Sequence, residues 1–352
     1  MAFLATYFAC STQEVTCYPR RKSFHAEGVG KTMAYIDVFN GDADGICALT
    51  QLRNADRVES TLVTGVKRDI ELLDKVEAGA GDHLTVLDVS MDKNRRGVER
   101  ALANGAAVFY VDHHYAGEIP QHAHLNAIIN EAPDVCTSIL VNGYLQGKFC
   151  AWAVVGAFGD NLKNSALALA KNLGVSADEL TLLENLGTYI NYNGYGENIA
   201  DLHFAPVELF RRVSPYANPL DFIRDSRAQF EKLENGYRND MASAAAIKPE
   251  FATAKAAVFM LPNQAWARRV SGVYSNDLTN QFPARAHAVL TEKSNGNYLI
   301  SVRAPLKNKM GADELCRRFP TGGGRAAAAG VNDLPKAQLR DFIDQFSAFF
   351  SA

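Results

Sequence analysis

The sequence predicts an α/β fold in which an N-terminal doubly wound parallel-sheet domain is followed by a smaller C-terminal α/β domain across a cleft. Three observations predict it. Short β-rich runs alternate with helical stretches from Met33 to about residue 111, a helical texture follows residue 130, and new strand candidates begin near residue 250. Strand–helix alternation with nearly continuous apolar strands is typical of parallel sheets, whose ligands bind beyond the carboxyl ends of the strands.

The N-terminal domain is expected to open with its first strand almost directly after Met33. Apolar runs predict strands over residues 35–39, 60–64, 83–89 and 106–111. Helical spacing predicts the intervening helices over residues 46–54, 69–76 and 93–103. Further helices are expected over residues 136–145, 150–158, 165–173 and 178–190, followed by a polar loop rich in Gly, Asn and Tyr over residues 191–197.

The C-terminal domain is expected to follow more helices, which continue to residue 245. Its strands are predicted over residues 254–261, 284–291 and 298–302, with helices near 266–278 and 312–319. The resulting division is an N-terminal domain over 33–200, a helical linker over 201–249 and a C-terminal domain over 250–352. Residues 1–32 show no strand or helix period, so we expect an extension that is disordered or belongs to a misplaced start.

The composition argues against several classes of protein, among them proteins that bind long nucleic acid, disulfide scaffolds and membrane proteins. Of the 352 residues, 36 are Lys or Arg and 39 are Asp or Glu, so no global basic field predicts stable binding to long nucleic acid. The six cysteines form no C-x-x-C pair, which favours reduced thiols in a cytoplasmic protein over a disulfide scaffold or a zinc ribbon. Since no apolar run is long enough to span a bilayer, we expect no membrane partner.

The most informative feature is the position of the acidic residues and histidines. They follow three predicted strands and one apolar helix: Asp42 and Asp44 after the first strand, Asp88 after the third, Asp112, His113 and His114 after the fourth, and Asp160 after the helix. A lone aspartate after a strand is usually a turn residue or an N-cap, and a buried histidine pair is often structural. The coincidence of the whole set at strand ends favours one functional site instead.

Carboxylates gathered at one edge of a sheet repel each other unless cations neutralise them. Oxygen ligands with some imidazole and no thiolate suit manganese or magnesium better than structural zinc. Two such ions can hold a hydroxide and clamp a phosphoryl group for in-line attack. The sequence therefore predicts a metal site for phosphoryl chemistry.

These residues resemble the DHH phosphoesterase superfamily. The resemblance rests on Asp-x-Asp-Gly after the first strand, an isolated Asp after a later strand, the Asp-His-His triplet and a further Asp on a helix. The run from Gly322 to Gly330 resembles the Gly-Gly-Gly-His-x-x-Ala-Ala-Gly signature of the DHH-associated C-terminal domain. The resemblance covers Met33 to about residue 332 and is closer to the small members that degrade short oligonucleotides and linear dinucleotides than to the large exonuclease branch.

The resemblance implies a role for each candidate. The metal ligands would be Asp42, Asp44, Asp88, His113 and Asp160, with Asp88 bridging two ions. His114 would face the substrate phosphate, and Asp112 would orient the histidine pair, so these two are the catalytic candidates. Substrate would be bound by Arg303 and by the segment Gly322, Gly323, Gly324 and Arg325.

Two positions depart from the family pattern. The family usually has a histidine two or four residues before the first motif aspartate, where this chain has Asn40 and Val38. Asn40 can ligate a metal through its side-chain oxygen, but more weakly than imidazole. Arg325 stands where the C-terminal signature has histidine, and its guanidinium offers a permanently charged fork for phosphate.

Each of the other candidates has two possible roles, one in binding and one purely structural. Alone, a glycine triplet such as 322–324 is more often a flexible loop, but Arg303 and Arg325 favour an anion cradle ahead of an alanine-rich helix. Thr137 is either a helix cap or a small hydroxyl residue near the site. Tyr192, Tyr195 and His203 either stack on a base or belong to the core.

The expected function is that of a manganese-dependent phosphodiesterase, with magnesium as the alternative ion. It would hydrolyse short oligoribonucleotides or linear dinucleotides such as pGpG to mononucleotides with water activated by two metals. The alternatives are a 3′-phosphoadenosine 5′-phosphate phosphatase and a nucleotide-binding sensor with crippled hydrolysis. Base preference, polarity of attack and oligomeric state, monomer or homodimer, are left open by the sequence.

Overall fold

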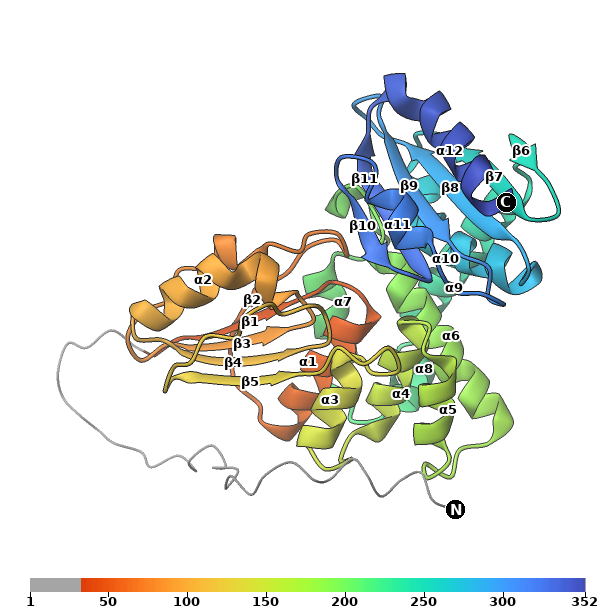
Figure 1. Cartoon of the computed structure of the whole chain (residues 1–352). Helices are drawn as coiled ribbons and strands as arrows, with labels where there is room; N and C mark the ends of the chain where they lie inside the picture. Colours follow the sequence, from red (N-terminus) through yellow and green to blue (C-terminus); the bar gives the residue numbers. More distant parts are fainter. Residues whose placement is uncertain (1–32, 352) are drawn as a thin grey trace, which may run out of the picture. The chain divides into compact units, whose positions relative to one another are not determined.

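The first sheet of the computed structural model is five-stranded and entirely parallel, which confirms the predicted doubly wound fold (Figure 1). The structure describes residues 33–351, and the extension expected over residues 1–32 lies outside the described residues. The strands lie in the order β2-β1-β3-β4-β5. Their bounds are β1 Tyr35–Phe39, β2 Thr61–Val63, β3 His83–Leu87, β4 Ala107–Asp112 and β5 Leu125–Ile129.

Both faces of this sheet are covered. Along β4, Val108 and Tyr110 pack in one cluster with α2 (Met91–Ala103), whereas Phe109 and Val111 pack in another with α1 (Ala43–Ala55). This alternation is the reason that the strands read as nearly continuous apolar runs. Strand β5 was missed in the sequence because it is an edge strand whose side chains are only partly covered, so it lacks such a run.

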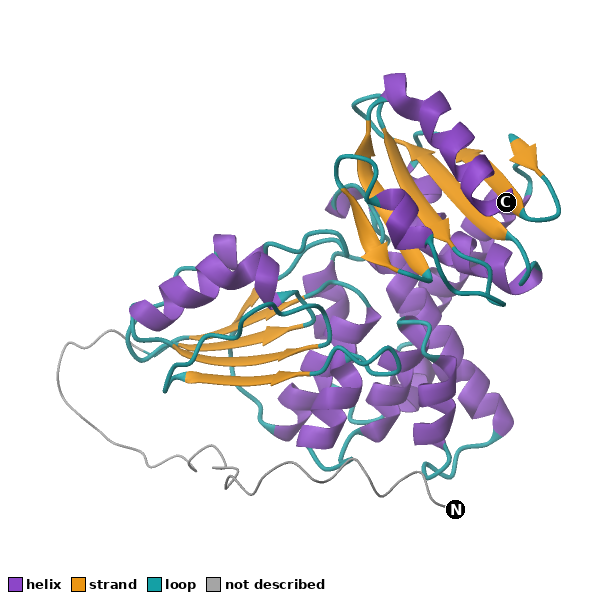
Figure 2. Cartoon of the chain, viewed as in Figure 1, coloured by secondary structure: helices purple, strands orange, loops and turns teal. Residues whose placement is uncertain are grey.

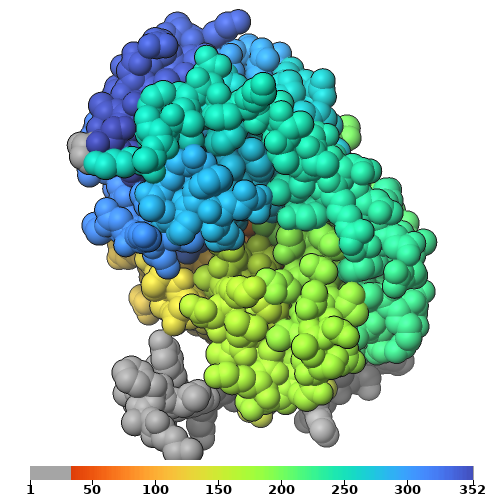
Figure 3. All heavy atoms as spheres, turned by 90° about the vertical axis from the view of Figure 1, so that its right-hand side faces the viewer, coloured from red at the N-terminus to blue at the C-terminus, as the bar shows by residue number. Residues whose placement is uncertain are grey.

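A helical layer packs on the α1 side of the sheet. Its helices are α3 Thr137–Tyr144, α4 Cys150–Gly159, α5 Lys163–Ala170, α6 Ala177–Gly194, α7 Pro206–Val213, α8 Pro219–Asp225 and α9 Arg227–Ala245, with a 3-10 turn η2 at Ile199–Asp201. Leu209, Phe222 and Leu233 belong to the same hydrophobic cluster as Trp152 of α4. The expected linker therefore contributes to this core, and Figure 3 shows residues 150–200 and 200–250 side by side on one face.

Two predicted elements of this region are wrong. The helix expected over residues 69–76 is only a 3-10 turn, η1 Leu72–Lys75, because side chains of α2 bind its backbone: Asn94 accepts from the Leu73 amide at 3.0 Å and Arg100 donates to the Leu73 carbonyl at 2.7 Å. The polar loop expected from residue 191 begins four residues later. Asn193 continues α6 because its side chain is fully buried and bonds the backbone of His203 and Phe204.

The second sheet is mixed, with the order β10-β11-β9-β8-β7-β6, and only β7 and β8 pair in parallel (Figure 2). Its strands are β6 Phe251–Ala252, β7 Ala256–Leu261, β8 Ala286–Glu292, β9 Tyr298–Arg303, β10 Gly322–Arg325 and β11 Ala328–Leu334. Its helices are α10 Ala265–Gln281, α11 Ala312–Cys316 and α12 Leu339–Ser351, with a 3-10 turn η3 at Lys336–Gln338.

The prediction for the glycine- and alanine-rich run from Gly322 to Gly330 is also wrong. The run forms the hairpin β10–β11 instead of a loop followed by a helix. Alanine favours helices, but β11 fills the open edge of β9, where pairing from Ala328 to Val331 satisfies its backbone. At Gly322 a side chain is excluded, because a Cβ there would lie 1.8 Å from the Cys316 carbonyl oxygen.

The composition predicts reduced cysteines and no membrane-spanning segment, and the structure bears on both for residues 33–351. Their four cysteines, Cys47, Cys136, Cys150 and Cys316, are all free thiols. No helix among residues 33–351 has the length and apolar character needed to cross a membrane.

Candidate metal centre

The loop after β1 places two aspartates at a helix N-terminus. Asp42 is the N-cap of α1, and its Oδ1 accepts from the Gly45 amide at 3.1 Å. Asp44 lies in the first turn, where its two carboxylate oxygens accept from the amides of Thr137 and Ser138 at the start of α3, each at 2.7 Å. Asp42 is therefore the N-cap, whereas Asp44 lies within the first turn, and the second oxygen of Asp42 is free of the cap and pairs with Lys67.

Asp88 stands directly after β3, in a backbone conformation with positive φ. Its backbone has a φ of 60°, a conformation that aspartate and asparagine tolerate better than most residues. Its Oδ1 accepts from the Thr137 hydroxyl at 3.2 Å, so the small hydroxyl residue predicted near the site does lie there. Burial, and then the charges of Asp44 and Asp42, raise the pKa of Asp88 well above its usual range. A bound cation would reverse this effect.

His113 is oriented by the protein backbone. Its Nδ1 lies 3.0 Å from the Val135 carbonyl oxygen, and because a carbonyl only accepts, Nδ1 carries the proton in the neutral ring. The lone pair of Nε2 then points at carboxylates, with Asp88 Oδ1 at 3.4 Å and oxygens of Asp44 and Asp160 each at 3.9 Å. A lone pair that faces three carboxylates is repulsive unless a cation lies between them.

His114 faces outward beside this group. Its Nδ1 is 2.7 Å from Asp112 Oδ1, and its side chain is 41% exposed, in contrast to the buried His113. Burial disfavours the imidazolium, but the hydrogen bond to Asp112 and the charges of Asp112 and Asp160 together outweigh it and raise the pKa of His114; the charge of Arg325 opposes that rise. The geometry thus agrees with Asp112 orienting His114.

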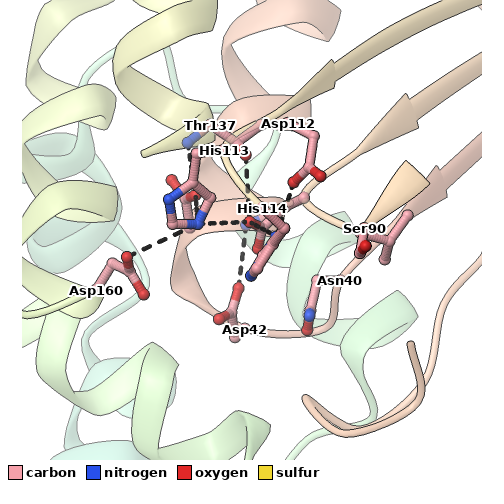
Figure 4. Close-up of polar contacts among 12 residues, drawn as sticks. Asn40, Asp42, Ser90, Asp112, His113, His114, Thr137 and Asp160 are labelled. Carbon is pink, nitrogen blue, oxygen red and sulfur yellow. Dashed lines mark hydrogen bonds and ion pairs between the residues drawn. The ribbon is translucent and has the colours of Figure 1, made fainter. Parts of the chain in front are cut away.

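Asp160 belongs to the helical layer and approaches the acids and histidines from that side. It is the C-cap of α4, and Figure 4 shows it facing His113, with Asp42 pointing into the same space. Its Oδ2 is buried and, among residues 33–351, has no hydrogen-bond partner, as is true of Asp112 Oδ2. Ligand atoms of Asp88, His113 and His114 all lie within 4.8 Å of one another. This set of oxygen and imidazole donors fits a divalent cation.

Lys67 is the residue of this site that the sequence reasoning missed. Its ammonium lies 2.5 Å from Asp42 Oδ2, 2.9 Å from Asn191 Oδ1 and 3.8 Å from Asp160 Oδ1. Burial disfavours its charge, but Asp42, Tyr195 and Asp160 together outweigh burial, so the pKa of Lys67 is raised well above its usual value. Lys67 follows β2 by four residues, so the strand-end argument that selected the acids could also have found it.

Asn40, the position where the family usually has histidine, does not join the acids through a hydrogen bond. Its Nδ2 donates to the Lys67 carbonyl at 3.2 Å, and its Oδ1 is buried without a partner among the described residues. The side chain therefore supports the segment that carries Lys67.

The two candidate arginines of the C-terminal domain share a face of the second sheet. Arg325 of β10 pairs in register with Ala328 of β11, which pairs with Arg303 of β9. Side chains in one register row project to the same side, and the small alanine leaves space between the guanidiniums. Arg303 is held by a 2.7 Å bond to Asn276 Oδ1, whereas Arg325 is exposed. The glycine triplet 322–324 is therefore part of strand β10, which carries Arg325, and is not a loop.

The aromatic candidates divide between the core and the site. Tyr192 is fully buried, and its hydroxyl contacts His203 Nε2 at 2.7 Å, Asp240 and Arg269, so Tyr192 and His203 belong to a buried polar network. Tyr195 instead lies beside Lys67, whose ammonium is 5.4 Å from the ring centroid.

No protein-family model matches the sequence, and no curated protein matches it. Solved structures do resemble this chain. A DHH domain described as a member of a family of ribosomal proteins matches with a TM-score of 0.60 at 12% identity, over 90% of this chain and 86% of that one.

Two further structures match at a TM-score of 0.51, each over 90% of this chain. One is the exonuclease RecJ bound to manganese, at 18% identity and 90% coverage of that chain. The other is a pGpG-specific phosphodiesterase, PggH, from Vibrio cholerae, at 16% identity and 98% coverage. The chain therefore shares the two-domain α/β fold of these solved structures.

Proposed function

We propose that this chain is a divalent-metal-dependent phosphodiesterase that hydrolyses short oligoribonucleotides or linear dinucleotides such as pGpG, with manganese as its preferred ion. The observation that carries the proposal is the orientation of His113, whose Nε2 lone pair faces Asp44, Asp88 and Asp160. The fold supports it, since two proteins with this fold are a manganese-bound exonuclease and a pGpG phosphodiesterase.

The donor set of Asp44, Asp88, His113 and Asp160 would hold the ion. When bound, such an ion lowers the pKa of water and polarises a phosphoryl oxygen. The residues around it supply the rest of the chemistry. The hydrogen bond and charge of Asp112 favour the imidazolium form of His114, in which Nδ1–H donates to Asp112 and Nε2–H would donate to a phosphoryl oxygen as negative charge develops.

Arg303 and Arg325 would hold the substrate phosphates that do not react. Both are cationic, they share one face of the sheet, and the charge of Arg325 reaches His114. A modest formal net charge of −3 for the whole chain agrees with a short substrate, because few phosphates then need neutralising.

The substrate is tested by offering pGpG, a short RNA and 3′-phosphoadenosine 5′-phosphate side by side to manganese-loaded protein, with products resolved by chromatography. We expect mononucleotides from pGpG and the RNA. Loss of the bisphosphate alone would favour a phosphatase. Tight binding of all three without turnover would contradict the enzymatic proposal and support a nucleotide sensor.

Removal of the metal gives a second prediction. Dialysis against a chelator is expected to abolish turnover, because the carboxylates and the imidazole lone pair would then repel one another and a phosphate. Manganese should restore it, which a titration of initial rate against added ion measures. Full activity after chelation, with metal content checked by mass spectrometry, would rule out a metal-dependent reaction.

Replacing Arg325 with alanine is expected to raise KM about tenfold to a hundredfold, because a charge-assisted hydrogen bond contributes about 1.5–3 kcal/mol. If Arg325 holds phosphate equally in the ground and transition states, kcat should change little. Steady-state kinetics on pGpG measures both. Arg317→Ala is the matched control, since Arg317 is exposed and pairs with Asp313 on its own helix; an equal KM in both variants would remove Arg325 from the substrate site.

A further inference from the structure

Lys67 brings a positive charge into the acidic site itself. Its side chain is only 22% exposed, and its ammonium donates hydrogen bonds to Asp42 Oδ2 and Asn191 Oδ1. Its charge also lies 3.8 Å from Asp160 Oδ1. Lys67 is thus anchored in the site and is unlike a solvated surface lysine.

The acids divide into two halves around Lys67. Asp88, His113 and His114 gather their ligand atoms within 4.8 Å on one side, and Asp44 contributes from the start of α1. Asp42 forms the other half: its Oδ2 is directed at Lys67, and its carboxyl also contacts Asp88. Asp160 borders both halves, with Oδ2 3.9 Å from His113 and Oδ1 3.8 Å from Lys67.

The half around Asp42 already holds the Lys67 ammonium, which pairs with Asp42 Oδ2, and the one further oxygen that Asn40 offers there is a neutral amide oxygen. The residue two positions earlier is Asn40, whose amide nitrogen is bonded to the Lys67 carbonyl. An ion bound there would have to displace the ammonium from Asp42, or lie beside it and be repelled by it. The half around Asp88 has an imidazole lone pair and a buried carboxylate oxygen without a partner among the described residues.

We propose that the Lys67 ammonium takes the place of one of the two cations expected from the family resemblance, so that the chain binds a single divalent ion at Asp88 and His113. This inference rests on the proposed metal-dependent function. It makes Lys67 a fixed monovalent charge beside the one exchangeable ion. The consequence is an isolated metal ion instead of a coupled pair.

The test is the number of Mn²⁺ ions bound by the metal-free full chain, from calorimetric titration with MnCl₂ and from electron paramagnetic resonance. We expect one ion per wild-type chain, with the hyperfine pattern of an isolated Mn²⁺. Lys67→Met removes the charge at similar length and should admit a second ion, with a spectrum showing coupling between the two. Lys93→Met is the control, because Lys93 also neighbours an aspartate but is exposed; it should bind one ion.

Each outcome decides something. Two coupled ions in the wild-type chain would overturn the Lys67 proposal and leave the proposed function standing. One ion in both the wild type and Lys67→Met would show that Lys67 does not exclude the second ion, which also overturns it. No Mn²⁺ binding by the wild type would instead contradict the metal-dependent function. If Lys67→Met fails to fold in a thermal melt, Lys67→Gln provides the neutral comparison, and the wild-type count still tests the proposal.

Discussion

Replacing Asp88 with asparagine is expected to lower kcat about a thousandfold while the fold remains intact. The carboxylate lies 3.4 Å from His113 Nε2 and is central to the donor set, and loss of a metal contribution of several kcal/mol corresponds to about three powers of ten in rate. Asparagine preserves the shape and tolerates the φ of 60°, which alanine would adopt only with strain.

The measurement combines kcat on pGpG, manganese affinity and thermal unfolding of the same preparation. Asp344→Asn is the matched control, because Asp344 is 60% exposed and pairs with Arg340 on its own helix; its kcat should equal that of the wild type. Normal turnover in both Asp88→Asn and a His113→Ala variant would contradict the assignment of the metal centre.

Replacing Gly187 with alanine is expected to lower the free energy of unfolding by about 3 kcal/mol, the upper part of the usual range for overpacking. A Cβ at Gly187 of α6 would lie 2.2 Å from the Val155 carbonyl oxygen and 2.9 Å from the Gly159 nitrogen of α4. The two helix backbones touch here, so the clash cannot be relieved by turning a side chain. Because Asp160 follows Gly159, manganese affinity should fall as well.

Gly143→Ala is the matched control for this change. Gly143 is also helical, in α3, but a Cβ there meets nothing within 4 Å. Alanine at such a position is expected to add about 0.5–1 kcal/mol of stability, since it restricts the unfolded chain. Denaturant unfolding of both variants measures the difference. Equal stability of the two would mean that α4 and α6 separate easily, and would remove this contact as the support of Asp160.

The sequence by itself determined the class of fold and the position of the acids. Strand–helix alternation predicts a parallel sheet, and a parallel sheet gathers the residues after its strands at one edge. This is why the sequence predicts Asp42, Asp88 and His113 at one edge of the sheet. The same rule, applied to the end of β2, also predicts Lys67 there. These features depend on residues close together in the chain.

Only the tertiary structure decided which side chains face each other and how some backbone groups are satisfied. The tautomer of His113 depends on the Val135 carbonyl, 22 positions away, and Lys67 reaches Asn191, 124 positions away. The alanine-rich run becomes a strand because β9 offers an open edge, which outweighs the local preference of alanine for helix. Partners so distant in sequence leave no periodic signal, so local patterns could not reveal them.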